Sequence, residues 1–389
     1  MSPAEERVPL ATILREWLRI GIIGFGGPPA HIALLRRLCV DRRRWISGQE
    51  FEDAISAVNL LPGPASTQLA IFCAWRLRRV QGALVGGVAF IVPGLLVILG
   101  LSALFLEKRP PIAVLGAALG AGAAVPAVAL RAALDLVPSS WARQPGPLAR
   151  HVPWLIYASF GAATAALAGQ YVVVVLIGCG LSEILRTSGS RNSAAALLIL
   201  KPATVLLAAA GAGGLLAVAY VALKVGALSY GGGFVIVPLM QHDAVTTFHW
   251  MSGSRFLGAV ALGQITPGPV VLTVAVVGYA AGRLPGALLA TFVAFTPSFL
   301  FVLFGAGSFG RLRGNARVQA FLSGSGPAAI GAIAGASITL GLEIAHEWQL
   351  GLLAVAFVVT VLARQQVVFA LVGAAVVGLV AGVLGAPVG

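Results

Sequence analysis

Two short stretches of sequence interrupt long apolar runs in the same way. "NLLPGPASTQL" covers Asn59–Leu69, and "GQITPGPVVLT" covers Gly263–Thr273. Each places proline, glycine and proline in the middle of a hydrophobic segment. A proline inside a helix removes a backbone donor and clashes with the preceding turn, which costs about 3 kcal/mol or more. The motif therefore predicts a helix break, and the same break is predicted twice, 205 residues apart.

The composition around these breaks indicates a membrane protein. The 389-residue chain is 58% hydrophobic and only 10% charged, whereas soluble domains carry about 25% charged residues. Segments such as Gly82–Leu106, Pro111–Val137 and Gly286–Phe309 approach or exceed the roughly 20 residues that cross the hydrocarbon core. The period-two alternation of a transmembrane β-barrel is absent. We therefore predict an all-α polytopic membrane protein.

The breaks belong to a longer internal repeat. Three further matches hold the same register as the two Pro-Gly-Pro motifs, with a slip of one residue at the last. They are "FGG" at Phe25–Gly27 with "YGG" at Tyr230–Gly232, "WISGQEF" at Trp45–Phe51 with "WMSGSRF" at Trp250–Phe256, and "GAL" at Gly82–Leu84 with "GAL" at Gly286–Leu288. The sequence thus predicts two homologous membrane repeats, residues 1–200 and residues 201–389. Transporters built from two repeats bind their substrate at the interface between them.

The distribution of charge predicts that the repeats are inverted. The formal net charge of +13 would suggest nucleic-acid binding in a soluble protein, but here the cations lie in short loops, as the positive-inside rule expects. Residues 1–80 contain eleven arginines, whereas residues 206–285 contain only three cations. The bias then reverses, because the loop Glu107–Pro111 is almost neutral and the loop Arg311–Arg317 is basic. Positive loops face the cytoplasm, so the two repeats should have opposite topology.

The N-terminal repeat also has an unusual order of basic clusters. Arg15 and Arg19, then Arg36–Arg44, then Arg76–Arg79 flank two consecutive apolar segments. Two full crossings would place the middle cluster on the opposite face from the outer two. Re-entrant hairpins over residues 17–38 and 51–75 would place all three on one face, although a broken helix that crosses fully has almost the same pattern. Non-helical backbone at this depth is tolerated only where it is buried in protein or lines a wet cavity.

Such breaks suit the binding of an anion. A helix that restarts inside the membrane has unpaired N–H groups at its N-terminus, where the helix dipole is positive. These ends bind anions without a cationic side chain, and glycine lets the ligand approach the backbone closely. Four motifs are predicted to supply converging helix ends: "GFGGPP", "LPGPAST", "SYGGGF" and "TPGPVV". The alternative is that the prolines only kink the helices for packing.

The motifs resemble those of the chromate ion transporter family. The resemblance rests on "GFGGPPAHIALL", "LLPGPASTQLAI", "SYGGGFVIVPLM" and "QITPGPVVLTVAVVGY", and it covers Gly24–Gly94 and Lys224–Ser298. It implies a multi-pass protein of the bacterial inner membrane that exports chromate, a tetrahedral dianion similar to sulfate. It also implies an antiporter driven by the proton-motive force and a link to chromate resistance. A sulfate or other oxyanion carrier and an anion channel of the same fold remain alternatives.

The predicted substrate-binding residues lie at the breaks. Glycines allow close approach, prolines start helices, and amides, hydroxyls and one lysine attract or bind the anion. They are Gly26, Gly27, Pro28, Asn59, Pro62, Gly63, Pro64, Thr67, Gln68, Lys224, Tyr230, Gly231, Gly232, Gly233, Gln264, Thr266, Pro267, Gly268, Pro269 and Thr273. Alternative roles are that the amides cap freed carbonyls, that the hydroxyls bond their own helix, and that Lys224 extends to the membrane interface.

The remaining predictions concern protons, chemistry and partners. His31 and Glu50 are the candidates for proton coupling, although a lone histidine is commonly structural and the repeat equivalent of Glu50 is Arg255. An intramembrane enzyme would need clustered acids, a nucleophile with its base or metal ligands, so we predict no catalytic residue, metal or cofactor. A Walker A motif is absent, which favours secondary transport. The expected partners are the anion and the lipid bilayer, without nucleic acid, and the chain is compatible with a homodimer.

Overall fold

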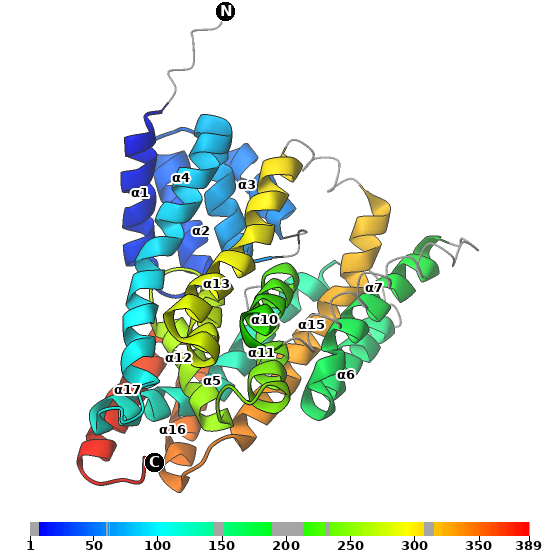
Figure 1. The fold of residues 1–389 in the computed structure, drawn as a ribbon. Coiled ribbons are helices and arrows are strands. Elements are labelled where there is room, and N and C mark those ends of the chain that lie inside the picture. Colours follow the sequence, from blue (N-terminus) through cyan, green and yellow to red (C-terminus); the bar gives the residue numbers. More distant parts are fainter. Residues whose placement is uncertain are drawn as a thin grey trace, which may run out of the picture.

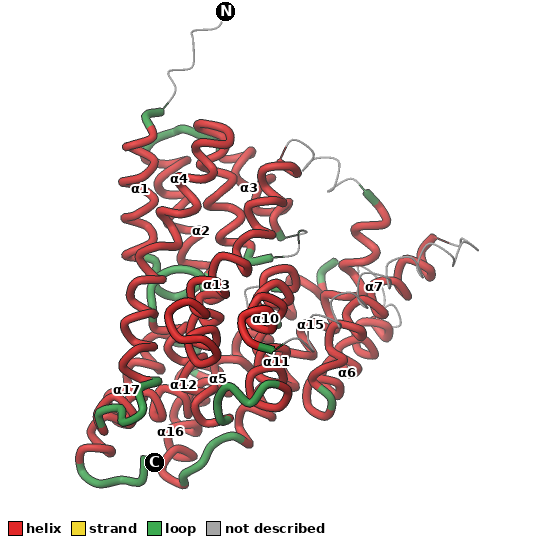
Figure 2. Tube along the Cα trace, viewed as in Figure 1, coloured by secondary structure: helices red, strands yellow, loops and turns green. Residues whose placement is uncertain are grey.

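The computed structural model describes residues 8–59, 61, 63–143, 151–188, 213–229, 234–306 and 315–388, and these residues form helices and loops without a β-strand (Figures 1 and 2). Five of the described helical segments are long and apolar enough to cross a membrane, judged by length and composition. They are Ala65–Phe105, Ile112–Trp141, Gly169–Thr187, Val270–Gly305 and Ala316–Leu342. The predicted all-α polytopic membrane fold is confirmed.

The order of helices in the first half recurs in the second. The first half contains α1 (Leu10–Ile23), α2 (Pro28–Arg36), α3 (Gly48–Val58), α4 (Ala65–Phe105), α5 (Ile112–Trp141), α6 (Val152–Leu167) and α7 (Val172–Ser188). The second contains α10 (Gly214–Leu228), α11 (Ile236–Gln241), α12 (Gly253–Ile265), α13 (Thr273–Gly305), α15 (Ala316–Leu342), α16 (Glu347–Phe357) and α17 (Val367–Val383). The predicted boundary between residues 200 and 201 lies outside the described residues.

The first hairpin of the N-terminal repeat is formed by α1 and α2. A π-helical segment, Arg37–Arg42, extends α2, and residues 28–42 together rise only about 22 Å, short of the roughly 30 Å hydrocarbon core. The chain then returns beside the middle of α1. Arg43 forms an ion pair with Glu16 of α1 at 2.6 Å, and Trp45 stacks on Trp17 with ring centroids 6.4 Å apart. Residues 28–42 therefore fold back beside α1 and form a hairpin with it.

The second hairpin is formed by α3 and the first arm of α4. Arg76, near the end of that arm, forms an ion pair with Glu50 at the start of α3. The helix then folds back at Arg79, which has a positive φ of 49°. Gly82 and Gly86 pack tightly against Ala74, so the second arm of α4 runs antiparallel to the first. The contacts of Arg43 with Glu16 and of Arg76 with Glu50 bring the three basic clusters to one end of the repeat, which is the arrangement that the hairpin alternative predicts.

The C-terminal repeat has equivalent hairpins. Lys224 of α10 forms an ion pair with Asp243, which lies in a π-helical segment that extends α11. The first arm of α13 ends at Arg283, whose φ of 54° matches that of Arg79 in the first repeat. Gly278 packs against Gly286 across this fold in the helix. Both repeats thus contain a π-helical extension of a short helix and a long helix that folds back at an arginine with positive φ.

The second arms of α4 and α13 run in opposite directions. Gly87 near the start of one arm packs against Phe299 near the end of the other. The guanidinium Nη1 of Arg283, where the second arm of α13 begins, donates to the carbonyl of Leu106 at the end of α4, 3.3 Å away. In Figure 1 the C-terminal ends of α4 and α13 accordingly lie at opposite ends of the molecule. The two repeats have inverted topology, as the charge distribution predicted.

The last helices of each repeat pack on the other repeat. Helix α15 packs along α6 and α7, and helix α5 packs along α16 and α17. Gly331 and Gly335 meet the backbone carbonyls of Ala158 and Ala162, so no larger side chain would fit at these contacts. Small residues let membrane helices approach closely. This packing of each repeat's last helices on the other repeat ties the two repeats together.

Candidate functional site

The helix breaks of the two repeats meet each other inside the molecule. The N–H of Gly63 donates to the carbonyl of Ser229 at 3.0 Å, and the N–H of Gly268 donates to the carbonyl of Gly24 at 3.0 Å. Gly63 and Gly268 are repeat equivalents, as are Gly24 and Ser229. We call the Gly63–Ser229 contact the first junction and the Gly268–Gly24 contact the second junction. Figure 2 shows loop segments between helices in this central region, away from the ends of the molecule.

The glycines of the junctions have a backbone conformation that other residues adopt with strain. The φ angle is +118° at Gly63 and +96° at Gly268, and Gly26 and Gly27 also have positive φ. A methyl group added to Gly63 would also lie 2.5 Å from Nε2 of Gln68, whereas one added to Gly268 would have no neighbour closer than 3.6 Å. Gly63 is therefore constrained by both strain and space, and Gly268 by strain.

The prolines lie where helices start, but two of them precede the first helical residue and so are not in the first turn. Pro28 is at the first position of α2, as predicted. Pro64 and Pro269 are instead the residues immediately before α4 and before the short 3₁₀ turn that leads into α13. The carbonyl of Pro64 accepts from the N–H groups of both Thr67 and Gln68 at 3.0 Å. The predicted Pro62 lies outside the described residues.

The first junction contains buried hydroxyl groups that lack a partner. Thr67, Ser229 and Ser298 are all 0% exposed, and none of their hydroxyl oxygens has a hydrogen-bond partner among the described residues. Ser298 comes from α13, and its Oγ is 3.3 Å from the position that a Cβ of Gly63 would take. No side chain caps α4, which begins just after this glycine. The junction thus combines a helix N-terminus with unpaired donors.

Two of these three serine and threonine residues were missed from the sequence. Ser229 directly precedes the predicted "YGGG" segment, and Ser298 directly follows Pro297 in α13. The repeat equivalent of Ser298 is Gly94, which likewise follows a proline. A comparison of the two repeats could have drawn attention to Ser298 as a hydroxyl found in only one repeat. Its position beside Gly63 depends on the packing of α13 against α4, which no local pattern describes.

The second junction is closely packed and largely apolar. The Cα of Gly94 packs against the Pro267 carbonyl, and Leu272 lies beside both Gly94 and Gly268. Thr266 donates to the carbonyl of Leu262 at 2.8 Å, and Thr273 donates to that of Val270 at 2.8 Å. Both predicted binding hydroxyls therefore bond the backbone within their own segment, which is the alternative role considered for them.

His31 completes the second junction. Its ring is fully buried, with Nε2 2.9 Å from the carbonyl of Gly24 and Nδ1 3.3 Å from Oγ of Ser66. The carbonyl of Gly24 thus accepts from the Gly268 N–H, and also from His31 in the Nε2–H tautomer. The ring also meets Phe90 edge-on, at 5.0 Å between centroids. His31 links the second junction to the first turn of α4.

The predicted amides occupy different environments. Asn59 is exposed, whereas its repeat equivalent Gln264 is buried, with an Nε2 that has no partner among the described residues. Gln68 is fully buried, and its Nε2 lies above Gly63 at the first junction. The equivalent of Gln68 is Thr273, which bonds backbone. The structure therefore brings Gln68 to a junction and leaves Asn59 at the surface.

The predicted charged residues are paired with other side chains. Lys224 forms a buried ion pair with Asp243, and its ammonium lies 5.3 Å from the centre of the Tyr220 ring. Asp243 therefore neutralises the ammonium of Lys224, which lies five residues before Ser229 in the sequence. Glu50 is paired with Arg76 at the end of the second hairpin. The predicted Tyr230, Gly231, Gly232 and Gly233 lie outside the described residues.

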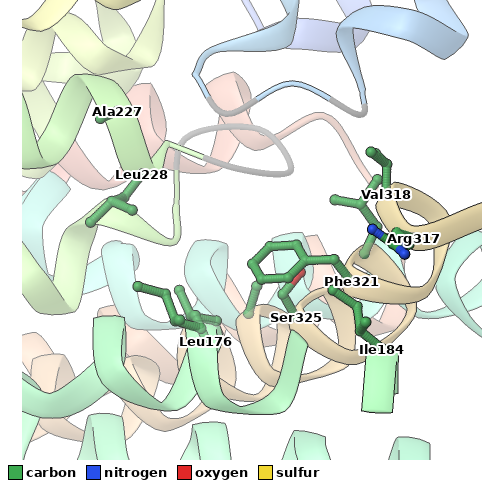
Figure 3. Close-up of a pocket in the computed structure, with 11 residues that line it drawn as sticks. Leu176, Ile184, Ala227, Leu228, Arg317, Val318, Phe321 and Ser325 are labelled. Carbon is green, nitrogen blue, oxygen red and sulfur yellow. The ribbon is translucent and has the colours of Figure 1, made fainter. Parts of the chain in front are cut away.

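A separate cavity of about 370 Å³ lies between α7, α10 and α15 (Figure 3). Leu176, Leu228 and Phe321 line it together with other apolar side chains, and Arg317 is the charged residue among the side chains that line it. A hydrated dianion would lose its hydrogen bonds in such surroundings. The junctions, and not this cavity, therefore have the chemistry of an anion site.

Comparison with known proteins identifies relatives over nearly the whole chain. The family model described as "Chromate transporter" matches twice, over residues 11–215 and 216–379. The chain is 32% identical over 386 residues to the chromate transport protein of Cupriavidus metallidurans, covering 96% of this chain and 93% of that protein. It is 30% identical over 356 residues to the chromate transport protein of Pseudomonas aeruginosa, covering 86% and 82% respectively. No solved structure matches the chain.

Proposed function

This chain belongs to the chromate transporter family, and we propose that it is a secondary transporter that exports chromate across the bacterial inner membrane. The anion binds at the helix breaks between the two repeats. Relatives that are named chromate transport proteins support the substrate, since the matches extend over most of both chains. A transport role, with no catalytic step, agrees with their names.

One observation carries the proposal for the site. The two hydrogen bonds between repeats, Gly63 to Ser229 and Gly268 to Gly24, hold helix breaks of both repeats together. Helix N-termini with unpaired N–H groups bind anions, and α4 begins at such a point without a side-chain cap. Because the binding groups come from both repeats, a change in how the repeats meet would change the site. That dependence is what alternating access requires.

Coupling to protons is part of the same proposal. His31 is bonded to Gly24 at the second junction and to Ser66 in the first turn of α4. Protonation of Nδ1 would remove the acceptor that the Ser66 hydroxyl uses in the Nε2–H tautomer. A proton on His31 would therefore change the hydrogen bonding at the start of α4. Glu50 is the second candidate, and its protonation would weaken the pair with Arg76 that closes the second hairpin.

The test is transport in inside-out membrane vesicles that contain the protein. We expect labelled chromate to accumulate when a proton gradient is imposed, acidic inside the vesicle, and to remain near equilibrium without it. Unlabelled sulfate should compete, because backbone N–H groups recognise a tetrahedral dianion by its shape and charge. Accumulation of sulfate in preference to chromate would identify an oxyanion carrier of different specificity. Rapid flux that ignores the proton gradient and only follows the anion gradient would indicate a channel.

A further inference from the structure

We propose that the two junctions are not equivalent and that each chain binds one tetrahedral dianion, at the first junction. The hydroxyl groups of Thr67, Ser229 and Ser298 donate hydrogen bonds to it, together with the N-terminus of α4. This inference rests on the proposed function for the class of anion. It adds a location, a stoichiometry and two binding residues, Ser229 and Ser298.

The first step is the cost of unpaired hydroxyl groups in a buried site. Thr67, Ser229 and Ser298 are fully buried, and their hydroxyls have no partner among the described residues. Buried polar groups in folded proteins are almost always hydrogen-bonded, so these unpaired hydroxyls, on residues that lie at or next to the first junction in the chain or in space, call for a missing partner. Elsewhere the chain satisfies such groups, for example Ser102 with the carbonyl of Ile98 and Thr291 with that of Ala287. A bound anion would accept from all three unpaired hydroxyls.

The second step is the comparison between the junctions. Thr67 is replaced by Leu272 in the second repeat, Ser229 corresponds to Gly24, and Ser298 corresponds to Gly94. Each hydroxyl of the first junction therefore has an apolar residue or a glycine at the equivalent position. At the second junction Gly94 is pressed against the Pro267 carbonyl and Leu272 occupies the remaining space. Near the second junction, the side-chain Nε2 of Gln264 is a buried donor without a hydrogen-bond partner among the described residues.

The third step is the geometry around Gly63. Oγ of Ser298 is 3.3 Å from the position of a Cβ on this glycine, and the Gly63 N–H is bonded to the carbonyl of Ser229. Thr67 lies in the first turn of α4, four residues further along the chain. The absence of a Cβ at Gly63 therefore leaves Ser298 in contact with the turn that starts α4. A tetrahedral anion has four oxygen atoms and so can accept from several donors at once.

The chemistry also agrees with release of the anion. The donors at the first junction are hydroxyls, backbone N–H groups and the Gln68 amide, all of them neutral, and the nearby cation Lys224 is already paired with Asp243. Neutral donors bind a dianion less tightly than a free guanidinium or ammonium would. Ser298 belongs to the C-terminal repeat, whereas Thr67 belongs to the N-terminal repeat. The site is complete only when α13 lies against α4, so movement between the repeats would take it apart.

The decisive experiment compares two substitutions on the same helix. Ser298→Ala removes an unpaired hydroxyl, and the matched control Thr291→Val removes a hydroxyl that is buried on α13 but bonded within its own helix at 2.8 Å. Binding of chromate and of sulfate is measured by calorimetry on purified full-length protein in nanodiscs. We expect Ser298→Ala to weaken both anions by about tenfold or more, and Thr291→Val to leave both affinities within about twofold. Thermal unfolding is recorded with and without anion.

The stability readout separates binding from a structural role. Without anion, Ser298→Ala should unfold at the same temperature as wild type or higher, because it removes a buried group that lacks a partner. The stabilisation of wild type by chromate should be largely lost in the variant, since stabilisation follows affinity. A variant that unfolds early without anion yet keeps its chromate affinity would assign Ser298 to packing and overturn the inference.

The number of anions per chain tests the asymmetry. We expect one chromate per chain of wild-type protein. Two anions per chain, or full chromate affinity in Ser298→Ala, would overturn the single site at the first junction. These results leave the proposed function intact if the wild-type protein still transports chromate. Wild-type protein that neither binds nor transports chromate or sulfate would contradict the proposed function as well.

Discussion

The N–H of Gly63 donates to the carbonyl of Ser229 across the boundary between two inverted repeats, at 3.0 Å. The equivalent bond joins Gly268 to Gly24 at the same distance. These bonds explain why proline-glycine-proline occurs twice. Each motif ends a helix, turns with a positive φ at its glycine, and uses that glycine to bind the break of the other repeat. Each break therefore has two roles: it starts a helix, and it forms a contact between the repeats.

The first prediction concerns the glycines of the two motifs. Gly63→Ala and Gly268→Ala should each destabilise the protein by about 1–3 kcal/mol, because alanine would have to adopt a positive φ. Gly63→Ala should reduce chromate flux more strongly, since its methyl group would also meet Gln68. Flux in proteoliposomes and the thermal midpoint are measured for both variants.

Gly100→Ala is the control for these glycines, because a methyl group there meets nothing within 4 Å. It should leave flux and stability close to wild type. If Gly63→Ala transports chromate at the wild-type rate, close approach of the anion at the first junction is excluded. Equal losses of flux in the two junction variants would show that strain alone explains the effect.

The second prediction concerns the ion pair between Lys224 and Asp243. Lys224→Gln leaves a buried carboxylate without its partner and should cost about 3–5 kcal/mol of stability. The double variant Lys224→Gln with Asp243→Asn removes both charges and should recover most of that stability. We expect chromate flux to recover together with the stability, because the ion pair has no net charge with which to attract the anion. A double variant that is stable but transports slowly would instead assign Lys224 to attraction of the anion.

The third prediction concerns topology. Arg36–Arg44 and Arg76–Arg79 lie at the same end of the N-terminal repeat, and both should face the cytoplasm. Residues 241–251 should face the opposite side, because the C-terminal repeat is inverted. Single cysteines introduced at these places can be labelled in intact cells and in inside-out vesicles. The native Cys39, Cys73 and Cys179 are buried and should label little. Labelling of residues 241–251 from the cytoplasm would contradict the inverted orientation in the membrane.

The fourth prediction concerns His31. His31→Ala removes the side chain that bonds both Gly24 and Ser66, so the protein should lose about 1–3 kcal/mol of stability. If His31 also carries the coupled proton, the variant should still allow chromate to move down its own gradient. It should no longer accumulate chromate when a proton gradient is imposed. A variant that accumulates chromate normally would limit His31 to a structural role, and Glu50→Gln would then be tested in the same assay.

The sequence alone determined the features that depend on local pattern or on composition. In a bilayer, the backbone N–H and C=O groups of a long continuous apolar segment find their hydrogen-bond partners within a helix. The all-α membrane fold therefore followed from the hydropathy of the sequence. The 205-residue register identified the repeat, and the reversal of basic loops identified the inversion. Proline and glycine act on the backbone wherever they occur, so the positions of the breaks at Gly63 and Gly268 also followed.

Only the tertiary structure decided which groups meet at the breaks. Asn59 and Gln264 hold the same place in the repeat, yet one is exposed and the other buried. From the sequence, Lys224 resembled a free cation. In the structure, the segment that extends α11 places Asp243 beside it. Ser298, 235 residues after Gly63, reaches the first junction because the second arm of α13 packs against α4. Contacts of this kind depend on how whole helices pack, and the periodicity of a single helix carries no information about its neighbour across the repeat interface.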